Sequence, residues 1–360
     1  MNGRVWERRS VLRLGLAGIA AALTSGCSGE GSPEAAGGGL KLGMVTDAGG
    51  VGDLSFNYMA SLGLERAKQE LGAEILIIES RQPSDYERNL QRAAERGCAV
   101  VFAIGFALED SLKKVAPQYR DVHFGIVDAD GPSEPNVTGI RFREEEGAFL
   151  VGALAGGMTR TGTIGFVGGM EIPLIKRFEA GYRAGLRTTR PDGSVLAKYT
   201  NNWEEVDKGR ELALTLFSQN ADIIFHGAGR CGLGVIEAAR SRGPGYWAIG
   251  VDADQDRLGT ADPENPQPPS RVLTSMLKRV DNAVFTLCQE AAQGKLEPGV
   301  RTFGVKEEGV GLTEMKYSRA EVPEELLKRV QELETLIRED KLDPPTTLEE
   351  LEAWNPPSAA

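Results

Sequence analysis

Residues 41–57 read KLGMVTDAGGVGDLSFN. The part from Leu42 to Thr46 is short and apolar, as expected of a buried strand. A glycine-rich loop follows, and a helical pattern from Ser55 to Leu71 begins directly after it. Glycines in such a loop let backbone N–H groups approach a ligand at the start of a helix. This stretch therefore predicts one strand, loop and helix unit of a parallel α/β sheet, with a candidate binding loop at the end of the strand.

The same alternation of strand and helix continues along the chain in two series. In the first series we expect strands at 42–46, 74–78, 99–104 and 122–127, with helices at 55–71 and 85–96. In the second series we expect strands at 163–167, 195–199, 221–226 and 246–251, with helices at 174–186, 203–217 and 233–241. Such alternation is typical of a parallel sheet that helices cover on both faces. The expected fold class is therefore α/β, with two doubly wound parallel-sheet lobes.

The remaining predicted elements are too few for a third domain. They are strands at 272–276 and 301–305 and helices at 281–292 and 323–339. We expect them to return to the two lobes, which makes several chain crossings and hence a hinge of several strands. The expected domains are an N-terminal lobe of 40–142 plus 276–300, a C-terminal lobe of 143–275 plus 301–342, and a disordered tail of 343–360.

Composition excludes several classes of function. The chain has 360 residues, of which 41% are apolar, and this is enough for two hydrophobic cores. It carries 52 Asp and Glu against 41 Lys and Arg, so a surface that follows nucleic-acid phosphates is not expected. The two histidines and four cysteines lack the spacing of metal ligands or of a disulfide framework. We therefore expect no metal, no cofactor and no nucleic-acid partner.

The N-terminus has the pattern of an export signal. Arginines at 4, 8, 9 and 13 precede an uncharged run at 14–26, which is too short to span a bilayer but suits the core of a signal peptide. The run ends in Thr24-Ser25-Gly26-Cys27, which resembles a lipobox, with Thr24 where leucine is usual. We expect a signal peptide at 1–26 and a lipid on Cys27.

The residues after Cys27 are rich in glycine, serine and proline, so 27–39 is expected to be a flexible tether. The protein would then be held at the cell membrane on its extracytoplasmic face. The run RRSVLR at 8–13 also resembles a twin-arginine export signal, and the sequence leaves open whether that route or the general secretory route is used.

Candidate ligand-binding residues follow the predicted strands, because ligands of open parallel sheets bind beyond the carboxyl ends of the strands. These residues are Asp47, Asp53, Phe56, Asn57, Asp128, Trp203, Gly229, Asp252, Gln255 and Lys278. Carboxylates can accept from ring N–H groups, amines or ribose hydroxyls, an ammonium can donate to a sugar oxygen, and aromatic rings can stack on a flat base. The set indicates a glycosylated heteroaromatic ligand, and its excess of acids favours a nucleoside over a nucleotide.

Several separated motifs resemble the basic membrane protein family, which comprises purine nucleoside receptor lipoproteins. They are DLSFN at 53–57, FLVG at 149–152, IGFVGGM at 164–170, GVDADQ at 250–255 and LTSMLK at 273–278. The match extends from about Leu40 to about Pro345. It implies a type I periplasmic-binding-protein-like fold without enzymatic activity. It also implies that the protein captures a purine nucleoside and delivers it to the permease of an ABC transporter.

The resemblance also implies roles for individual residues. Phe56 and Trp203 would stack on the base, Asp47 and Asp128 would read its polar edge, Asp252 and Lys278 would hold the ribose, and Gly229 would lie close by. Asp53, Asn57 and Gln255 could contact the ligand or only brace the loops. Two departures leave the preferred purine open, since Trp203 stands where relatives often have Phe and Gly52 stands where Asn is frequent.

Other interpretations compete with this one. GAGRCG at 227–232 matches the dinucleotide-binding pattern, and Asp252 follows 20 residues after Gly232, so an exported NAD-dependent oxidoreductase is the main alternative. Against it, the motif lies in the second lobe and no residues for hydride transfer stand out. A transcription factor with a sensor fold would need a helix-turn-helix or basic segment, which the sequence lacks. For single residues the simpler readings are a turn for Asp47, packing for Phe56 and Trp203, and a solvated charge for Lys278.

Overall fold

A computed structural model describes residues 39–356 of the chain. The predicted signal peptide, the predicted lipidation site Cys27 and almost all of the predicted tether lie outside these residues. Among the helices that the structure describes, none is both long enough and apolar enough to cross a membrane.

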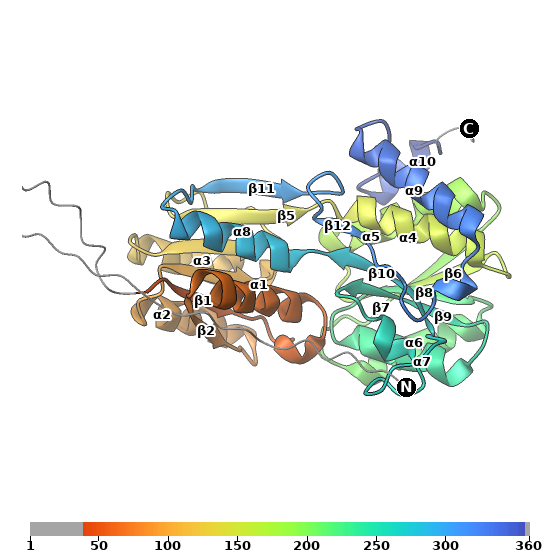
Figure 1. The fold of residues 1–360 in the computed structure, drawn as a ribbon, viewed down its shortest axis with the longest axis horizontal. Coiled ribbons are helices and arrows are strands. Elements are labelled where there is room, and N and C mark those ends of the chain that lie inside the picture. Colours follow the sequence, from red (N-terminus) through yellow and green to blue (C-terminus); the bar gives the residue numbers. More distant parts are fainter. Residues whose placement is uncertain (1–38, 357–360) are drawn as a thin grey trace, which may run out of the picture. The chain divides into compact units, whose positions relative to one another are not determined.

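The strands and helices form two sets, and the chain passes more than once from one set to the other (Figure 1). The strands of the first set are β1 (Lys41–Val45), β2 (Glu74–Ile78), β3 (Val100–Ile104), β4 (His123–Val127), β5 (Val137–Phe142) and β11 (Gly299–Phe303). Its helices are α1 (Phe56–Leu71), α2 (Tyr86–Glu95), α3 (Glu109–Val115) and α8 (Val280–Ala292). The second set has strands β6 (Thr163–Gly168), β7 (Ser194–Tyr199), β8 (Ile223–Gly227), β9 (Trp247–Asp252), β10 (Val272–Lys278) and β12 (Val310–Leu312). Its helices are α4 (Glu144–Met158), α5 (Pro173–Thr189), α6 (Val206–Ser218), α7 (Cys231–Arg242), α9 (Glu324–Arg338) and α10 (Leu348–Ala353).

Each set forms one six-stranded sheet with helices on both faces. The strand orders are β11-β5-β4-β3-β1-β2 and β12-β10-β9-β8-β6-β7, and every neighbouring pair is parallel except β10 with β12. In the first lobe α1 and α8 pack together on one face, while α2 and α3 cover the other. In the second lobe α6 and α7 cover one face, and α4 and α5 cover the other. The predicted fold class, with two doubly wound lobes, is confirmed.

The elements that the sequence patterns did not predict are β5, β12 and the helices α3, α4 and α10. Helix α4 is the largest of these, and its residues from Glu144 to Gly156 are all buried. A helix that is buried on every side has no polar stripe, so the helical period is absent from its sequence. Strand β12 has only three residues, which is too short for a recognisable alternation.

The chain passes between the lobes three times, at residues 142–144, 278–280 and 303–310. The expected domain boundaries at 276 and 300 differ from this, because they cut through β10 and β11. Met276 pairs with Leu312 of β12 in the second sheet, and Phe303 pairs with Phe142 of β5 in the first. Backbone pairing therefore assigns the whole of β10 to the second lobe and the whole of β11 to the first.

The tail beyond residue 342 is ordered as far as the structure describes it, so the expected disorder of 343–356 is wrong. Helix α10 is capped by Thr347, whose side chain accepts from Glu350 N at 3.1 Å. Leu351 is buried, and the Trp354 ring lies edge-on to Phe149 of α4 at a centroid distance of 5.9 Å. The TLEE run at 347–350 is a capping-box pattern that could have predicted this helix. The apolar surface that receives Leu351 and Trp354 exists only in the folded second lobe.

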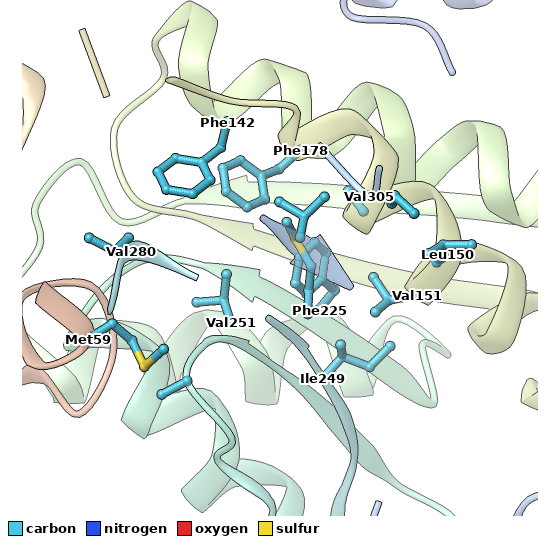
Figure 2. Packing of buried hydrophobic residues seen from close by; sticks show 14 of the residues in the cluster. Met59, Phe142, Leu150, Val151, Phe178, Phe225, Ile249, Val251, Val280 and Val305 are labelled. Atoms are coloured by element: carbon cyan, nitrogen blue, oxygen red, sulfur yellow. The ribbon is translucent and has the colours of Figure 1, made fainter. Parts of the chain in front are cut away.

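One apolar cluster extends through both lobes (Figure 2). It includes Met59 of α1 and Phe142 of β5 in the first lobe, and Phe225 of β8 and Ile249 of β9 in the second. The close packing of α4 on α5 belongs to the same core. At Gly152 of α4, a side chain would clash with the backbone carbonyl of Tyr182 on α5. Because the obstacle is main chain, no rotamer change can relieve the clash.

We predict that Gly152→Ala lowers the free energy of unfolding by about 1 to 3 kcal/mol, since the added methyl group must push α4 and α5 apart. Urea denaturation of the protein without its first 39 residues measures this free energy. Gly311→Ala is the matched control, because a methyl group there meets nothing within 4 Å, and it should change stability by less than about 0.5 kcal/mol. Equal stabilities for the two variants would contradict the packing argument.

Candidate ligand-binding site

A cleft lies where the carboxyl ends of the strands of both lobes meet. The space between the lining residues is about 610 Å³, including the part that is open to solvent. The first lobe contributes Asp47, Gly49, Asp53, Phe56, Asn57, Gly105, Phe106 and Asp128. The second lobe contributes Leu174, Ile175, Phe178, Trp203, Gly227, Gly229, Arg230, Val251, Asp252 and Lys278.

Nine of the ten residues that we selected from the sequence line this cleft: Asp47, Asp53, Phe56, Asn57, Asp128, Trp203, Gly229, Asp252 and Lys278. The tenth, Gln255, does not line it. Sequence reasoning missed Phe106, Leu174, Phe178 and Arg230. Phe178 lies on helix α5 rather than at the end of a strand, so the rule that selected the other residues could not find it.

The loop before α1 is held by Asp53. One oxygen of this carboxylate accepts from Ser55 N at 2.9 Å and from Tyr58 N at 3.1 Å, and the other accepts from Asn57 N at 2.8 Å. These are N–H groups of the first helical turn, which have no partner inside the helix. Asp53 therefore braces the loop and the helix start, although burial raises its pKa above the usual value.

Asp47 uses only one of its two carboxylate oxygens in hydrogen bonds with the described residues. Its Oδ1 accepts from Gly49 N and from Asn57 Nδ2, both at 2.9 Å, and these are the hydrogen bonds that described residues give to this carboxylate. Burial raises the pKa of Asp47 to about 6, and the two hydrogen bonds oppose that rise. At neutral pH the carboxyl is mainly ionised and can accept a hydrogen bond from an N–H group.

Asp128 and Asp252 occupy equivalent places in the two lobes. Asp128 follows β4, which lies between β3 and β5, and Asp252 ends β9, which lies between β8 and β10. Both have left-handed backbone conformations, with φ of 67° and 63°. Aspartate tolerates this conformation better than most residues with a side chain. Each strand of this pair thus ends with a carboxylate at the cleft.

Lys278 is buried, so the reading of this residue as a solvated charge is wrong. Its Nζ lies 2.6 Å from Asp128 Oδ1 and 3.1 Å from Glu144 Oε1, and its side chain is 2% exposed. Burial favours a lower pKa for the ammonium group, but the carboxylates of Asp128, Glu144 and Asp252 outweigh it and raise the pKa. Lys278 is therefore charged at neutral pH.

Aromatic rings surround the same ammonium group. The ring centroids of Phe56 and Phe142 each lie 5.1 Å from Lys278 Nζ, and that of Phe178 lies 5.7 Å away. Ring faces at these distances attract a cation. Removing one partner of a buried ion pair typically costs about 3 to 5 kcal/mol of stability, so Lys278→Ala would report on folding as well as on binding.

Asp252 receives a hydrogen bond from the opposite lobe. Ser55 Oγ donates to Asp252 Oδ2, and among the described residues no hydrogen bond to Oδ1 is found. Burial raises the pKa of Asp252 to about 7, although the nearby Lys278 charge and the Ser55 hydroxyl both lower it. A ligand hydroxyl that donates to this carboxyl would favour its ionised form.

Trp203 lies in the loop between β7 and α6. The expected helix from 203 begins instead at Val206, because Asn202 Oδ1 accepts from Glu204 N at 3.1 Å and Glu205 N at 2.9 Å and so holds a turn there. Any side chain at Gly169 would clash with the indole, so the glycine in IGFVGGM makes room for this ring. Gly229, with φ of 53°, also approaches Trp203.

The GAGRCG run at 227–232 has a packing explanation. A side chain at Gly232 would clash with the imidazole of His226, which is completely buried beneath the start of α7. The third glycine of the pattern thus admits a histidine ring. Nothing in this packing calls for a dinucleotide, and the motif is accounted for without one.

Comparisons with known proteins agree on one family. A family model described as Bmp, ABC transporter substrate-binding protein PnrA-like, matches residues 40–340. The chain is 35% identical over 300 residues to the CD4+ T-cell-stimulating antigen of Listeria monocytogenes, covering 80% of this chain and 83% of that protein. It is 33% identical over 308 residues to the ABC transporter nucleoside-binding protein BmpA of Lactococcus lactis, covering 82% and 86%. A solute-binding protein of an ABC transporter system from Aeropyrum pernix has a similar structure, with a TM-score of 0.75, 27% identity, and coverage of 87% of this chain and 96% of that one.

The family match covers both lobes and all of the cleft residues named above. It decides against the oxidoreductase, because the family consists of substrate-binding proteins rather than enzymes. It confirms the resemblance carried by the sequence motifs. This chain belongs to the Bmp family of PnrA-like ABC transporter substrate-binding proteins.

Proposed function

We propose that this chain captures a purine nucleoside in the cleft between its lobes and delivers it to the permease of an ABC transporter. The observation that supports this most directly is the chemistry of the cleft. Aromatic side chains from both lobes line it together with several carboxylates and one buried ammonium group. The Lactococcus lactis relative is named as a nucleoside-binding protein, which agrees with this ligand class.

The base would lie between the lobes against aromatic side chains. Phe56 from the first lobe and Trp203 from the second are both partly exposed and line the same cleft. Flat rings stack well on such side chains. Asp47, with one oxygen not used by donors in the part of the chain that the structure describes, would accept from an N–H group on the edge of the base. Asp128 already accepts a hydrogen bond from the Lys278 ammonium group. It could accept another from the base only while it keeps that bond.

The ribose would lie near Asp252 and Lys278. Lys278 donates a hydrogen bond to Asp128 and forms an ion pair with Glu144, and an ammonium group has three protons, so one can be donated to a sugar oxygen. Asp252 uses one oxygen for Ser55 and can accept from a ribose hydroxyl with the other. Sugar recognition would thus depend on groups that are already oriented by protein contacts.

A phosphate group fits the cleft poorly. The lining contains the carboxyls of Asp47, Asp53, Asp128 and Asp252 but only two cationic side chains, Arg230 and Lys278. Lys278 is already neutralised by two carboxylates. Like charges that face each other in a partly desolvated site repel strongly. The proposed ligand is therefore a nucleoside and not a nucleotide.

Transport would follow from closure of the lobes on the ligand. Each lobe supplies part of the contacts, and three chain segments connect the lobes, so a ligand that touches both favours the arrangement in which they are close. The permease would recognise that arrangement. We further propose that a lipid on Cys27 holds the protein at the outer face of the cell membrane after export, which fits the uncharged run at 14–26.

We predict that adenosine, guanosine or inosine raises the melting temperature of the soluble form that begins at Leu40. At about 100 times Kd a ligand stabilises the folded state by about 2.7 kcal/mol. Ribose, NAD and the matching nucleoside monophosphate should cause no shift. Differential scanning fluorimetry with this panel tests the proposal, and a shift with NAD but with no nucleoside would overturn it.

The role of Asp252 is tested with Asp252→Asn, which keeps the size of the side chain and removes its charge. A hydrogen bond to a charged group is worth about 1.5 to 3 kcal/mol, so ribonucleoside affinity should fall by roughly 10- to 150-fold. Isothermal titration calorimetry should show a much smaller loss for the 2′,3′-dideoxynucleoside. Asp254→Asn, at an exposed neighbouring carboxylate, is the control. Equal losses for both ligands would mean that Asp252 does not hold the sugar.

Anchoring is tested separately with Cys27→Ser. The variant should appear in the soluble fraction of the cell envelope while its nucleoside affinity is unchanged, because the anchor lies outside both lobes. Cys98→Ser, the same change at a buried cysteine of the first lobe, should stay with the membrane fraction. If Cys27→Ser also stays with the membrane, the lipid anchor at this residue is wrong.

A further inference from the structure

Gln255 connects the two lobes without lining the cleft. It lies in the loop after β9 of the second lobe and is 1% exposed. Its Nε2 donates to the carbonyl oxygen of Leu54 at 3.2 Å, and Leu54 belongs to the loop before α1 of the first lobe. This hydrogen bond lies beside the one from Ser55 to Asp252, so two adjacent residues of the first lobe bond to the end of β9 and its loop.

The orientation of the Gln255 amide is determined by its partners. Its Oε1 accepts from Val251 N at 3.1 Å and lies 3.0 Å from His226 Nε2. A backbone N–H can only donate and a backbone carbonyl can only accept, so Oε1 must face Val251 and Nε2 must face Leu54. The same logic requires His226 to carry its proton on Nε2 and to donate it to Gln255.

The surrounding backbone leaves room for this arrangement at two glycines. A side chain at Gly232 would clash with the His226 ring, and a Cβ at Gly250 would lie 2.7 Å from Gln255 Oε1. Gln255 N also donates to Ser275 Oγ at 3.1 Å, which fixes the main chain of the loop. Gly232, His226, Gly250 and Gln255 therefore form one packed unit in the second lobe that ends in a donor directed at the first.

We infer that Gln255 is a positioning residue for closure: held by His226 and Val251, it stabilises the contact between the lobes and raises ligand affinity without touching the ligand. The inference rests on the proposed function only for the identity of the ligand. A group that favours the binding-competent arrangement raises the apparent affinity in proportion to the population of that arrangement. Because Gln255 does not touch the ligand, every nucleoside should gain by the same factor.

Gln255→Glu tests this most sharply. Glutamate keeps an acceptor for Val251 N and His226 Nε2 but replaces the donor that faces Leu54 with an oxygen. We expect nucleoside dissociation to become about three- to tenfold faster, while the association rate changes by less than about twofold, because the bond forms after encounter. Stopped-flow fluorescence, with Trp203 in the cleft as a reporter, measures both rates. Gln219→Glu, the same change at an exposed position, should leave both rates unchanged.

Small-angle X-ray scattering of the unliganded protein gives a second readout that needs no ligand. Gln255→Glu and Gln255→Met should have a larger radius of gyration than the parent and than Gln219→Glu, because the unliganded lobes separate more often. If no nucleoside binds the parent protein, the proposed function fails, and this comparison still decides on the contact between the lobes.

Two outcomes would overturn the inference. One is unchanged dissociation and unchanged scattering in folded Gln255→Glu and Gln255→Met. The other is a loss of affinity that differs between adenosine, guanosine and inosine, since unequal losses would indicate a direct contact with the base. If neither Gln255 variant folds, His226→Leu applies the same test, because it removes one of the two donors that hold Gln255 Oε1, and we expect a smaller but still uniform rise in the dissociation rate.

Discussion

The buried ammonium group of Lys278 brings together charged side chains from three parts of the chain. Its carboxylate partners are Asp128, after β4 of the first lobe, and Glu144, at the first crossing between the lobes. Lys278 itself ends β10, directly before the second crossing. A charge that is nearly excluded from water requires such partners, because an unpaired buried charge is very costly. The same buried charges therefore hold together two of the chain crossings, at Glu144 and Lys278, and the cleft residue Asp128.

The two lobes repeat the same order of five parallel strands but differ in chemistry at their equivalent carboxylates. Asp128 and Asp252 end equivalent strands in the same left-handed conformation. Asp128 has an ammonium group within hydrogen-bonding distance, whereas Asp252 has the neutral hydroxyl of Ser55. Burial raises the pKa of Asp252 to about 7, although the charge of Lys278 lowers it. An approximately symmetric fold thus has two chemically unlike surfaces at its cleft.

Glycines in the sequence motifs serve mainly to let large side chains approach the backbone. Gly152 admits the main chain of α5, Gly169 admits Trp203, and Gly232 admits His226. A pattern such as Gly-x-Gly-x-x-Gly indicates where backbone and another group come close, but it does not identify the group. In this protein the group at the third glycine is an imidazole of its own core, which orients Gln255 at the contact between the lobes.

Local sequence patterns were sufficient to predict the alternation of strands and helices, the two lobes and nine of the residues that line the cleft, because the carboxyl ends of parallel strands must share one edge. They were insufficient for α4, which is buried on every side, and for the tail, whose docking surface is formed by distant residues. They were also insufficient to predict that Lys278 is buried and that the Gln255 amide faces the other lobe. The sequence does not show whether a lysine after a strand is solvated or buried. It also does not show which lobe the amide of a glutamine faces. Both properties depend on which groups from distant parts of the chain meet that side chain, and only tertiary packing decides that.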